Sequence, residues 1–134
     1  KITLQKLAKQ SNIDDKVHFL GYQNNPFKYI KKAKFFVLSS LNEGLPNVIL
    51  ESLACGTPVV AFDCLSGPNE MIQHQENGLL VENQNVDKLT EAMNLFIEDE
   101  NLYRYCKQNA PQSVQSFSVL AIGQQWLNLM KISL

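Results

Sequence analysis

The stretch SSLNEGLPNVILESLACGTPVVAFD, residues 39–63, predicts a strand, a turn, a helix and a second strand in succession. Pro46 suits the first position of that helix, and Gly56 followed by Pro58 predicts its end. The helix is apolar on almost every side, yet it carries Glu51 near its middle. A buried ionised carboxylate is costly unless it is paired or hydrogen-bonded. Glu51 is therefore either satisfied by nearby backbone or available to a polar ligand.

Short apolar runs alternate with helical patterns along the rest of the chain. The runs are β-branched or aromatic and apolar on both faces, which is typical of parallel strands covered on both sides. The alternation predicts βαβ units, so the expected fold class is α/β, a Rossmann-like parallel sheet with helices on both faces. Expected strands cover 16–21, 35–40, 58–62 and 77–82. Expected helices cover 2–11, 26–33, 46–55, 67–72, 86–98, 100–109 and 118–132.

The bulk composition excludes some classes without identifying a function. The chain has 134 residues, of which 45% are hydrophobic, and this fits one ordinary globular domain. Its formal net charge of -1 gives no electrostatic reason to expect nucleic acid or an anionic membrane. No apolar run approaches the roughly 20 residues that a membrane-spanning helix needs. The cysteines, Cys55, Cys64 and Cys106, show no metal-type spacing and indicate reduced thiols in a cytosolic setting.

The turn before the central helix combines features of a ligand site. It follows the strand that ends at Ser39–Ser40, and open α/β folds bind ligands at the carboxyl edge of the sheet. The N–H groups at the helix N-terminus favour an anion, and Gly44 lets a ligand approach the backbone closely. Glu43 in the turn and Glu51, one turn below the helix N-terminus, could each accept hydrogen bonds from hydroxyls. A nucleotide sugar has this layout, with hydroxyls at both ends and negative groups between them.

The segment EGLPNVILE, residues 43–51, has two glutamates separated by seven residues. It resembles the signature of the retaining glycosyltransferases of family 4, which have the GT-B fold. The similarity is to the carboxyl-terminal, donor-binding domain of that fold, and it covers at least residues 16–98. It extends through SLACGTPVVAFD (52–63), SGPNEMI (66–72) and ENGLLV (76–81), and upstream to VHFLGY (17–22).

The resemblance implies a role for each matching residue. Glu43 matches the catalytic glutamate that contacts the donor sugar near the reacting carbon. Glu51 matches the glutamate that holds the ribose hydroxyls, and Val48 matches the residue that packs near the nucleoside. The other matches are the turn that borders the sugar and phosphates, Gly44, Leu45, Pro46 and Asn47, and the loop beside the base, Gly21 and Tyr22.

The implied reaction transfers a hexose or N-acetylhexosamine from a nucleotide diphosphate, with UDP as the expected nucleotide. The anomeric configuration is retained through a same-face displacement with an oxocarbenium-like ion pair, in which the departing phosphate helps to deprotonate the acceptor. Glu43 would then orient the sugar and stabilise charge rather than act as a nucleophile. The implied role is polysaccharide or glycolipid biosynthesis.

Several parts of the family pattern have no match in this chain. There is no Asp-x-Asp, the metal-binding motif of the other main glycosyltransferase fold, so neither a metal nor a cofactor is expected. The Arg and Lys that face the diphosphate in the family, the strands before 16–21 and the amino-terminal acceptor-binding domain are also unmatched. The chain is therefore expected to be a single partial nucleotide-sugar-binding domain over 1–134, inactive alone. A strand at 16–21 without its neighbours predicts an exposed apolar sheet edge or an irregular gap.

The expected partners are a nucleotide-sugar donor and, through the missing domain, a sugar or lipid-linked acceptor, but not nucleic acid. The expected location is cytoplasmic, and peripheral association of the full-length protein with the inner face of the membrane is open. Two alternatives also stay open. One is a nucleotide-sugar epimerase of the same fold, for which the chain supplies no catalytic acids or histidines. The other is a non-catalytic module that binds a nucleotide sugar without transferring it.

Overall fold

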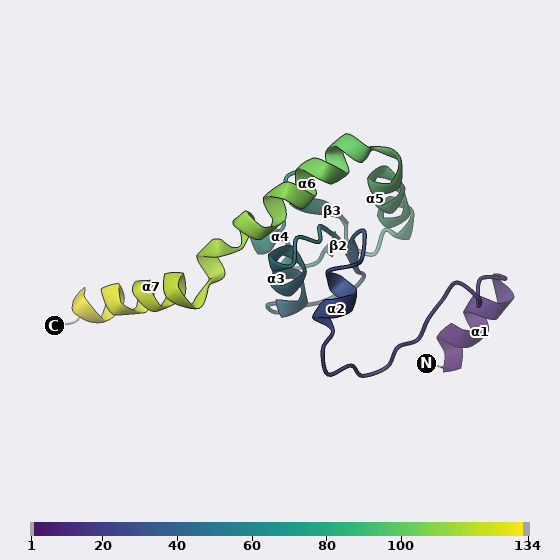
Figure 1. Ribbon diagram of the computed structural model, residues 1–134, viewed down its shortest axis with the longest axis horizontal. Coiled ribbons are helices and arrows are strands. Elements are labelled where there is room, and N and C mark those ends of the chain that lie inside the picture. The colour runs from purple at the N-terminus through teal and green to yellow at the C-terminus, as the bar shows by residue number, and fades with distance from the viewer. Residues whose placement is uncertain (1, 133–134) are drawn as a thin grey trace.

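Residues 2–132 are described by a computed structural model of the chain, whose centre is a three-stranded parallel sheet (Figure 1). The strands are β1 (Phe36–Leu38), β2 (Val59–Asp63) and β3 (Gly78–Glu82), in the order β1-β2-β3. The α/β fold class is thus confirmed. The helices are α1 (Ile2–Gln10), α2 (Phe27–Ile30), α3 (Asn47–Ala54), α4 (Pro68–Met71), α5 (Val86–Glu98), α6 (Glu100–Ser113), the 3-10 helix η1 (Gln115–Phe117) and α7 (Val119–Ile132).

Successive residues of β2 serve opposite faces of the sheet, which explains why this strand is apolar throughout. Two buried clusters result, one on each face. The α3-side core contains Ile49, Leu53, Val59, Ala61, Met71, Ile72, Ala110 and Val114. The α5-side core contains Val60, Phe62, Leu79, Leu89, Ala92, Phe96, Tyr103 and Cys106.

The long helix α6 contributes to both cores. Tyr103 and Cys106 belong to the α5-side core, and Ala110 one turn later belongs to the α3-side core. The sequence predicts this helix over 100–109. The helix instead continues through Pro111 to Ser113. Burial of Ala110 and of the following Val114 against α3 offsets the hydrogen bond that the proline cannot donate.

The strand predicted over 16–21 does not form. Residues 17–23 have no regular structure, and no strand among residues 2–132 lies beside them to complete a ladder. A strand is stable only when a neighbour pairs with its backbone, so a suitable apolar pattern is not sufficient. Leu20 is 50% exposed, which agrees with the expected irregular apolar gap. Within the described chain β1 pairs only with β2, so its other edge is open.

Both terminal helices stand apart from the central body (Figure 1). The last helix, α7, exposes a largely apolar surface that includes Leu120, 86% exposed, and Trp126, 62% exposed. None of the helices in the described part of the chain combines the length and the apolar character needed to cross a bilayer.

Candidate functional site

The loops that follow the three strands meet at the carboxyl edge of the sheet. The Glu43 turn, defined here as residues 41–46, lies between β1 and α3 in the chain. The Glu43 carbonyl oxygen accepts a hydrogen bond of 2.6 Å from Ser66 Oγ, in the loop after β2. The Leu41 carbonyl oxygen accepts one of 3.2 Å from Asn83 Nδ2, in the loop after β3. The turn is therefore held by two loops that are distant in the sequence.

The turn also has a close packing contact with Gly67. Gly67 has φ +93, and a Cβ at this position would lie 2.6 Å from Pro46 Cδ and closer still to the Gly44 carbonyl oxygen. Gly44 itself is exposed, and the space where its Cβ would lie is open. One side of the turn thus rests on the Gly67 loop, and a ligand can approach it on the other side.

The N-terminus of α3 offers unpaired backbone donors. Pro46 is the N-cap rather than the first helical residue, and it makes no side-chain cap hydrogen bond. The displacement follows from its extended ψ of 86°, which places Asn47 at the start of the helix. In the chain from 2 to 132, no acceptor is hydrogen-bonded to the N–H of Asn47 or Val48. These two donors are available to an anion at the positive end of the helix.

Glu51 is half-buried in the second turn of α3. No side chain or backbone group of residues 2–132 hydrogen-bonds to its carboxylate or forms an ion pair with it, so neighbouring backbone does not satisfy it. The residue lines an open groove of about 410 Å³ between α3 and the α6–η1 segment. The other lining residues are Leu50, Ala54, Pro111, Val114, Gln115, Phe117 and Ser118. The groove is therefore mainly apolar, with one carboxylate at its wall.

The other predicted site residues discussed next do not line the groove beside Glu51. Glu43 is half-buried but does not line the groove beside Glu51, so a cleft shared by the two glutamates stays a prediction. Val48 is half-buried and Leu45 is 54% exposed. Tyr22 is 90% exposed in the irregular segment before α2, next to the exposed Gly21. The contact of Gly21 and Tyr22 with a base also stays a prediction.

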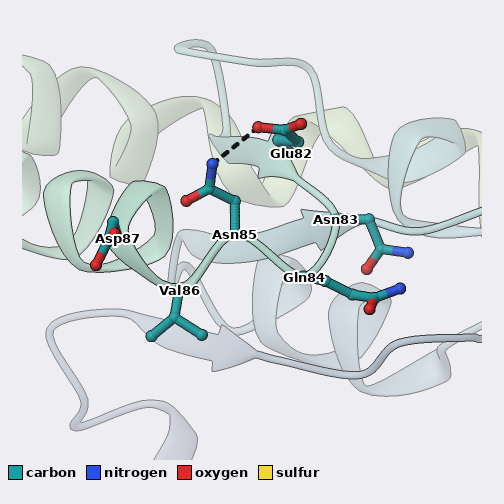
Figure 2. Close-up of a pocket in the computed structure, with 6 residues that line it drawn as sticks. All are labelled: Glu82, Asn83, Gln84, Asn85, Val86 and Asp87. Carbon is teal, nitrogen blue, oxygen red and sulfur yellow. Dashed lines mark hydrogen bonds between the residues drawn. The ribbon is translucent and has the colours of Figure 1, made fainter.

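The loop between β3 and α5 forms a second hollow, of about 460 Å³ (Figure 2). Asn85 caps α5, because its side-chain oxygen accepts from the Lys88 N–H at 3.0 Å while its Nδ2 donates to Glu82 Oε2 at 2.8 Å. Asn83 reaches Leu41, as described above. Sequence reasoning missed this loop, although an Asn directly before a predicted helix at 86 is a cap signal.

Titratable groups outside this edge do not add chemistry to it. Burial raises the pKa of the Cys106 thiol to about 11, and the negative charge of Glu76 adds to the rise. A buried thiol with a raised pKa is inert, which agrees with its place in the α5-side core. Across the described residues no three His, Cys, Asp or Glu side chains are grouped so that they could hold a metal ion.

Comparison with known proteins gives a consistent set of relatives. Residues 1–113 match the family described as glycosyl transferases group 1. An N-acetylgalactosamine-N,N'-diacetylbacillosaminyl-diphospho-undecaprenol 4-alpha-N-acetylgalactosaminyltransferase of Campylobacter jejuni is 37% identical over 130 residues, which are 97% of this chain and 36% of that protein. The poly(ribitol-phosphate) alpha-N-acetylglucosaminyltransferase of Staphylococcus aureus is 28% identical, over 96% of this chain and 26% of that protein.

Two solved structures share the fold of this chain. Anabaena Alr3699/HepE in complex with UDP superposes with a TM-score of 0.90 at 28% identity, over 98% of this chain and 36% of that one. The lipopolysaccharide outer core galactosyltransferase WaaB in its apo form has a TM-score of 0.87 at 25% identity, over 98% of this chain and 38% of that one. This chain thus spans 26–38% of the length of these relatives.

Proposed function

Because the chain belongs to the glycosyl transferases group 1 family, we propose that it is the donor-binding domain of a glycosyltransferase and binds a nucleotide diphosphate sugar. The acceptor-binding domain and the cations that face the diphosphate would then lie outside residues 1–134. The observation that carries the proposal is the Glu51 carboxylate. It is half-buried beside an open groove and has no partner within the described chain. Such a group is suited to hydroxyl donors of a ligand.

The proposed donor lies across the carboxyl edge of the sheet. Glu51 accepts from the ribose hydroxyls, and Glu43 accepts from the hydroxyls of the transferred sugar. The free N–H groups of Asn47 and Val48, with the open space beside Gly44, favour the diphosphate between them. The groove beside Glu51 has a volume within the range of small-molecule sites, roughly 300–1,000 Å³. Leu45 and Pro46 shape the edge of the turn, while Val48, Gly21 and Tyr22 border the nucleoside.

We infer that the nucleotide is UDP. Two of the solved relatives support this choice, since structures of Anabaena Alr3699/HepE hold UDP or UDP-glucose and one of S. aureus TarM holds UDP. The sugar is a hexose or N-acetylhexosamine, and the names of the Campylobacter and Staphylococcus relatives favour the second.

In the full-length protein the sugar is proposed to pass to a sugar or lipid-linked acceptor with retention of configuration. Glu43 orients the sugar and stabilises the positive charge that develops at the anomeric carbon, and the departing phosphate takes the acceptor proton. The setting is polysaccharide or glycolipid biosynthesis in the cytoplasm, at the inner face of the membrane where the acceptor is lipid-linked. The undecaprenol-linked acceptor in the name of the Campylobacter relative supports this setting.

Calorimetric titration of the chain with UDP, GDP and ADP tests the proposal. We expect UDP to bind more tightly than the two purine nucleotides. Heats of dilution alone for all three would refute nucleotide binding. Incubation with UDP-N-acetylglucosamine, followed by proton NMR, distinguishes the epimerase alternative, because an epimerised sugar gives a new anomeric doublet.

A further inference from the structure

We propose that Ser66, Gly67 and Asn83 are positioning residues, which hold the Glu43 turn in the conformation that meets the donor sugar. The proposal rests on the proposed function and extends it to two loops outside the EGLPNVILE segment. These residues do not contact the sugar themselves. They act on the backbone on both sides of Glu43.

The Ser66 contact fixes Glu43 itself. Its hydroxyl donates to the Glu43 carbonyl oxygen at 2.6 Å, which is at the short end of the range for O–H···O hydrogen bonds. The bond is partly buried and joins residues 23 positions apart. Because the acceptor belongs to the residue whose carboxylate would meet the sugar, the bond restrains the Cα from which that side chain projects.

The Gly67 contact supports the next residues of the turn. Its left-handed φ of +93 brings its Cα against the Gly44 carbonyl oxygen and Pro46 Cδ, with no room for a side chain. Gly67 is also buried. The loop after β2 can therefore lie directly under the turn only while this position is glycine.

Asn83 restrains the turn two residues before Glu43. Its Nδ2 donates to the Leu41 carbonyl oxygen, whereas its Oδ1 is buried without a hydrogen-bond partner in the described chain. In Figure 2 this side chain points away from Glu82 and Asn85, so it takes no part in the cap of α5. A buried unpaired oxygen is unfavourable. Among residues 2–132, the bond to Leu41 is thus the one hydrogen bond that this side chain makes.

The three contacts act together on a segment that has no regular secondary structure of its own. A free loop would have to be ordered when the sugar binds, and that ordering would oppose binding. Restraint at Leu41, Glu43, Gly44 and Pro46 places the Glu43 carboxylate before the ligand arrives. The expected consequence is selective for the contact at Glu43 itself. Loss of the Ser66 hydrogen bond weakens recognition of the sugar but not of the nucleotide.

Calorimetry with UDP, UDP-glucose and UDP-N-acetylglucosamine measures this selectivity in Ser66→Ala. We expect the affinity for the better UDP-sugar to fall by about three- to tenfold, as for the loss of one hydrogen bond, with UDP affinity unchanged. The matched control is Ser52→Ala, which removes a buried hydroxyl that donates at 3.0 Å to the Thr57 carbonyl, beyond the C-terminal end of α3, and not to the turn. In a Glu43→Gln background, Ser66→Ala should have no additional effect on sugar affinity. An equal loss for UDP, or a full additional loss in that background, would overturn the proposal.

A measurement on the ligand-free chain separates this inference from the proposed function. Backbone ¹⁵N relaxation should show the Glu43 and Gly44 amides as ordered in the parent chain and more mobile in Ser66→Ala and Gly67→Ala. In Ser52→Ala these amides should stay ordered. If the chain binds no uridine nucleotide, the proposed function fails while the relaxation data still decide whether the turn is held. Unchanged relaxation in both loop variants would refute the positioning role.

Discussion

Replacement of Glu51 by Ala should separate a ligand-binding role of this carboxylate from a structural role. In the folded chain the carboxylate has no partner among residues 2–132, so its removal breaks no internal contact. The residue lies inside α3, where Ala is the more favourable helix former. We therefore expect the free energy of unfolding to change by no more than about 0.5 kcal/mol, as for a neutral surface substitution.

The effect on ligand binding should be much larger. A hydrogen bond from a hydroxyl to a carboxylate contributes about 1.5–3 kcal/mol, and two such bonds to one ribose are not additive. A loss in this range weakens UDP binding by about 10- to 150-fold. Glu51→Gln, which keeps an acceptor but loses the charge, should lie between the parent and the alanine variant.

Calorimetry with UDP and thermal unfolding of the same samples measure the two effects. Glu91→Ala is the matched control, because this glutamate is exposed and its only charged partner in the described chain is Lys88, at 2.8 Å. It should leave UDP affinity unchanged. The reasoning is refuted if Glu51→Ala binds UDP as tightly as the parent, or if it loses more than about 1 kcal/mol of stability, a loss typical of a residue with an internal structural role.

Three further predictions concern the fold. Gly78→Ala should destabilise the chain by about 1–3 kcal/mol in chemical unfolding, since a Cβ there would collide with the backbone of β2, whereas Gly123→Ala, with open space around it, should not. Leu53→Ala should cost about 2–5 kcal/mol, because the side chain is fully buried, and a loss below 1 kcal/mol would contradict its place in the core. Under native conditions at pH 8 a thiol reagent should label Cys55 and spare Cys106 until denaturant is added. With a pKa of about 11, roughly one in a thousand Cys106 thiols would be ionised at that pH even if the reagent had access.

The parts of the fold that depend on local signals were predictable from the sequence. Gly56 and Pro58 mark the end of α3 within a residue, and α5 forms over the predicted range 86–98. The strand at 16–21 failed because pairing is a property of two segments, and its apolar pattern carries no information about a neighbour. The helix predicted over 100–109 continues to Ser113, since tertiary burial of Ala110 outweighs the local helix-breaking signal of Pro111.

In the candidate site, too, the residues with a local sequence signal could be predicted and the residues without one could not. Glu43 and Glu51 could be selected because an acidic residue in a glycine turn, and another inside an apolar helix, are locally anomalous. Ser66 and Asn83 could not, because their hydrogen bonds to the turn cross 23 and 42 positions of the chain. Ordinary loop residues acquire such a role only when a parallel sheet brings the carboxyl ends of its strands together.

Helix α6 has a consequence for the thermodynamics of the domain. The first turns of α6 cover one face of the sheet, and its last turn covers the other. The two layers therefore cannot unfold separately unless this helix breaks. Unfolding of the region from α3 to α6 should thus be a single transition, whichever probe follows it. The groove beside Glu51 is lined in part by Pro111, on the same helix. Occupation of that groove would then protect amides in both layers from hydrogen exchange, including those on the face of the sheet that the ligand never touches.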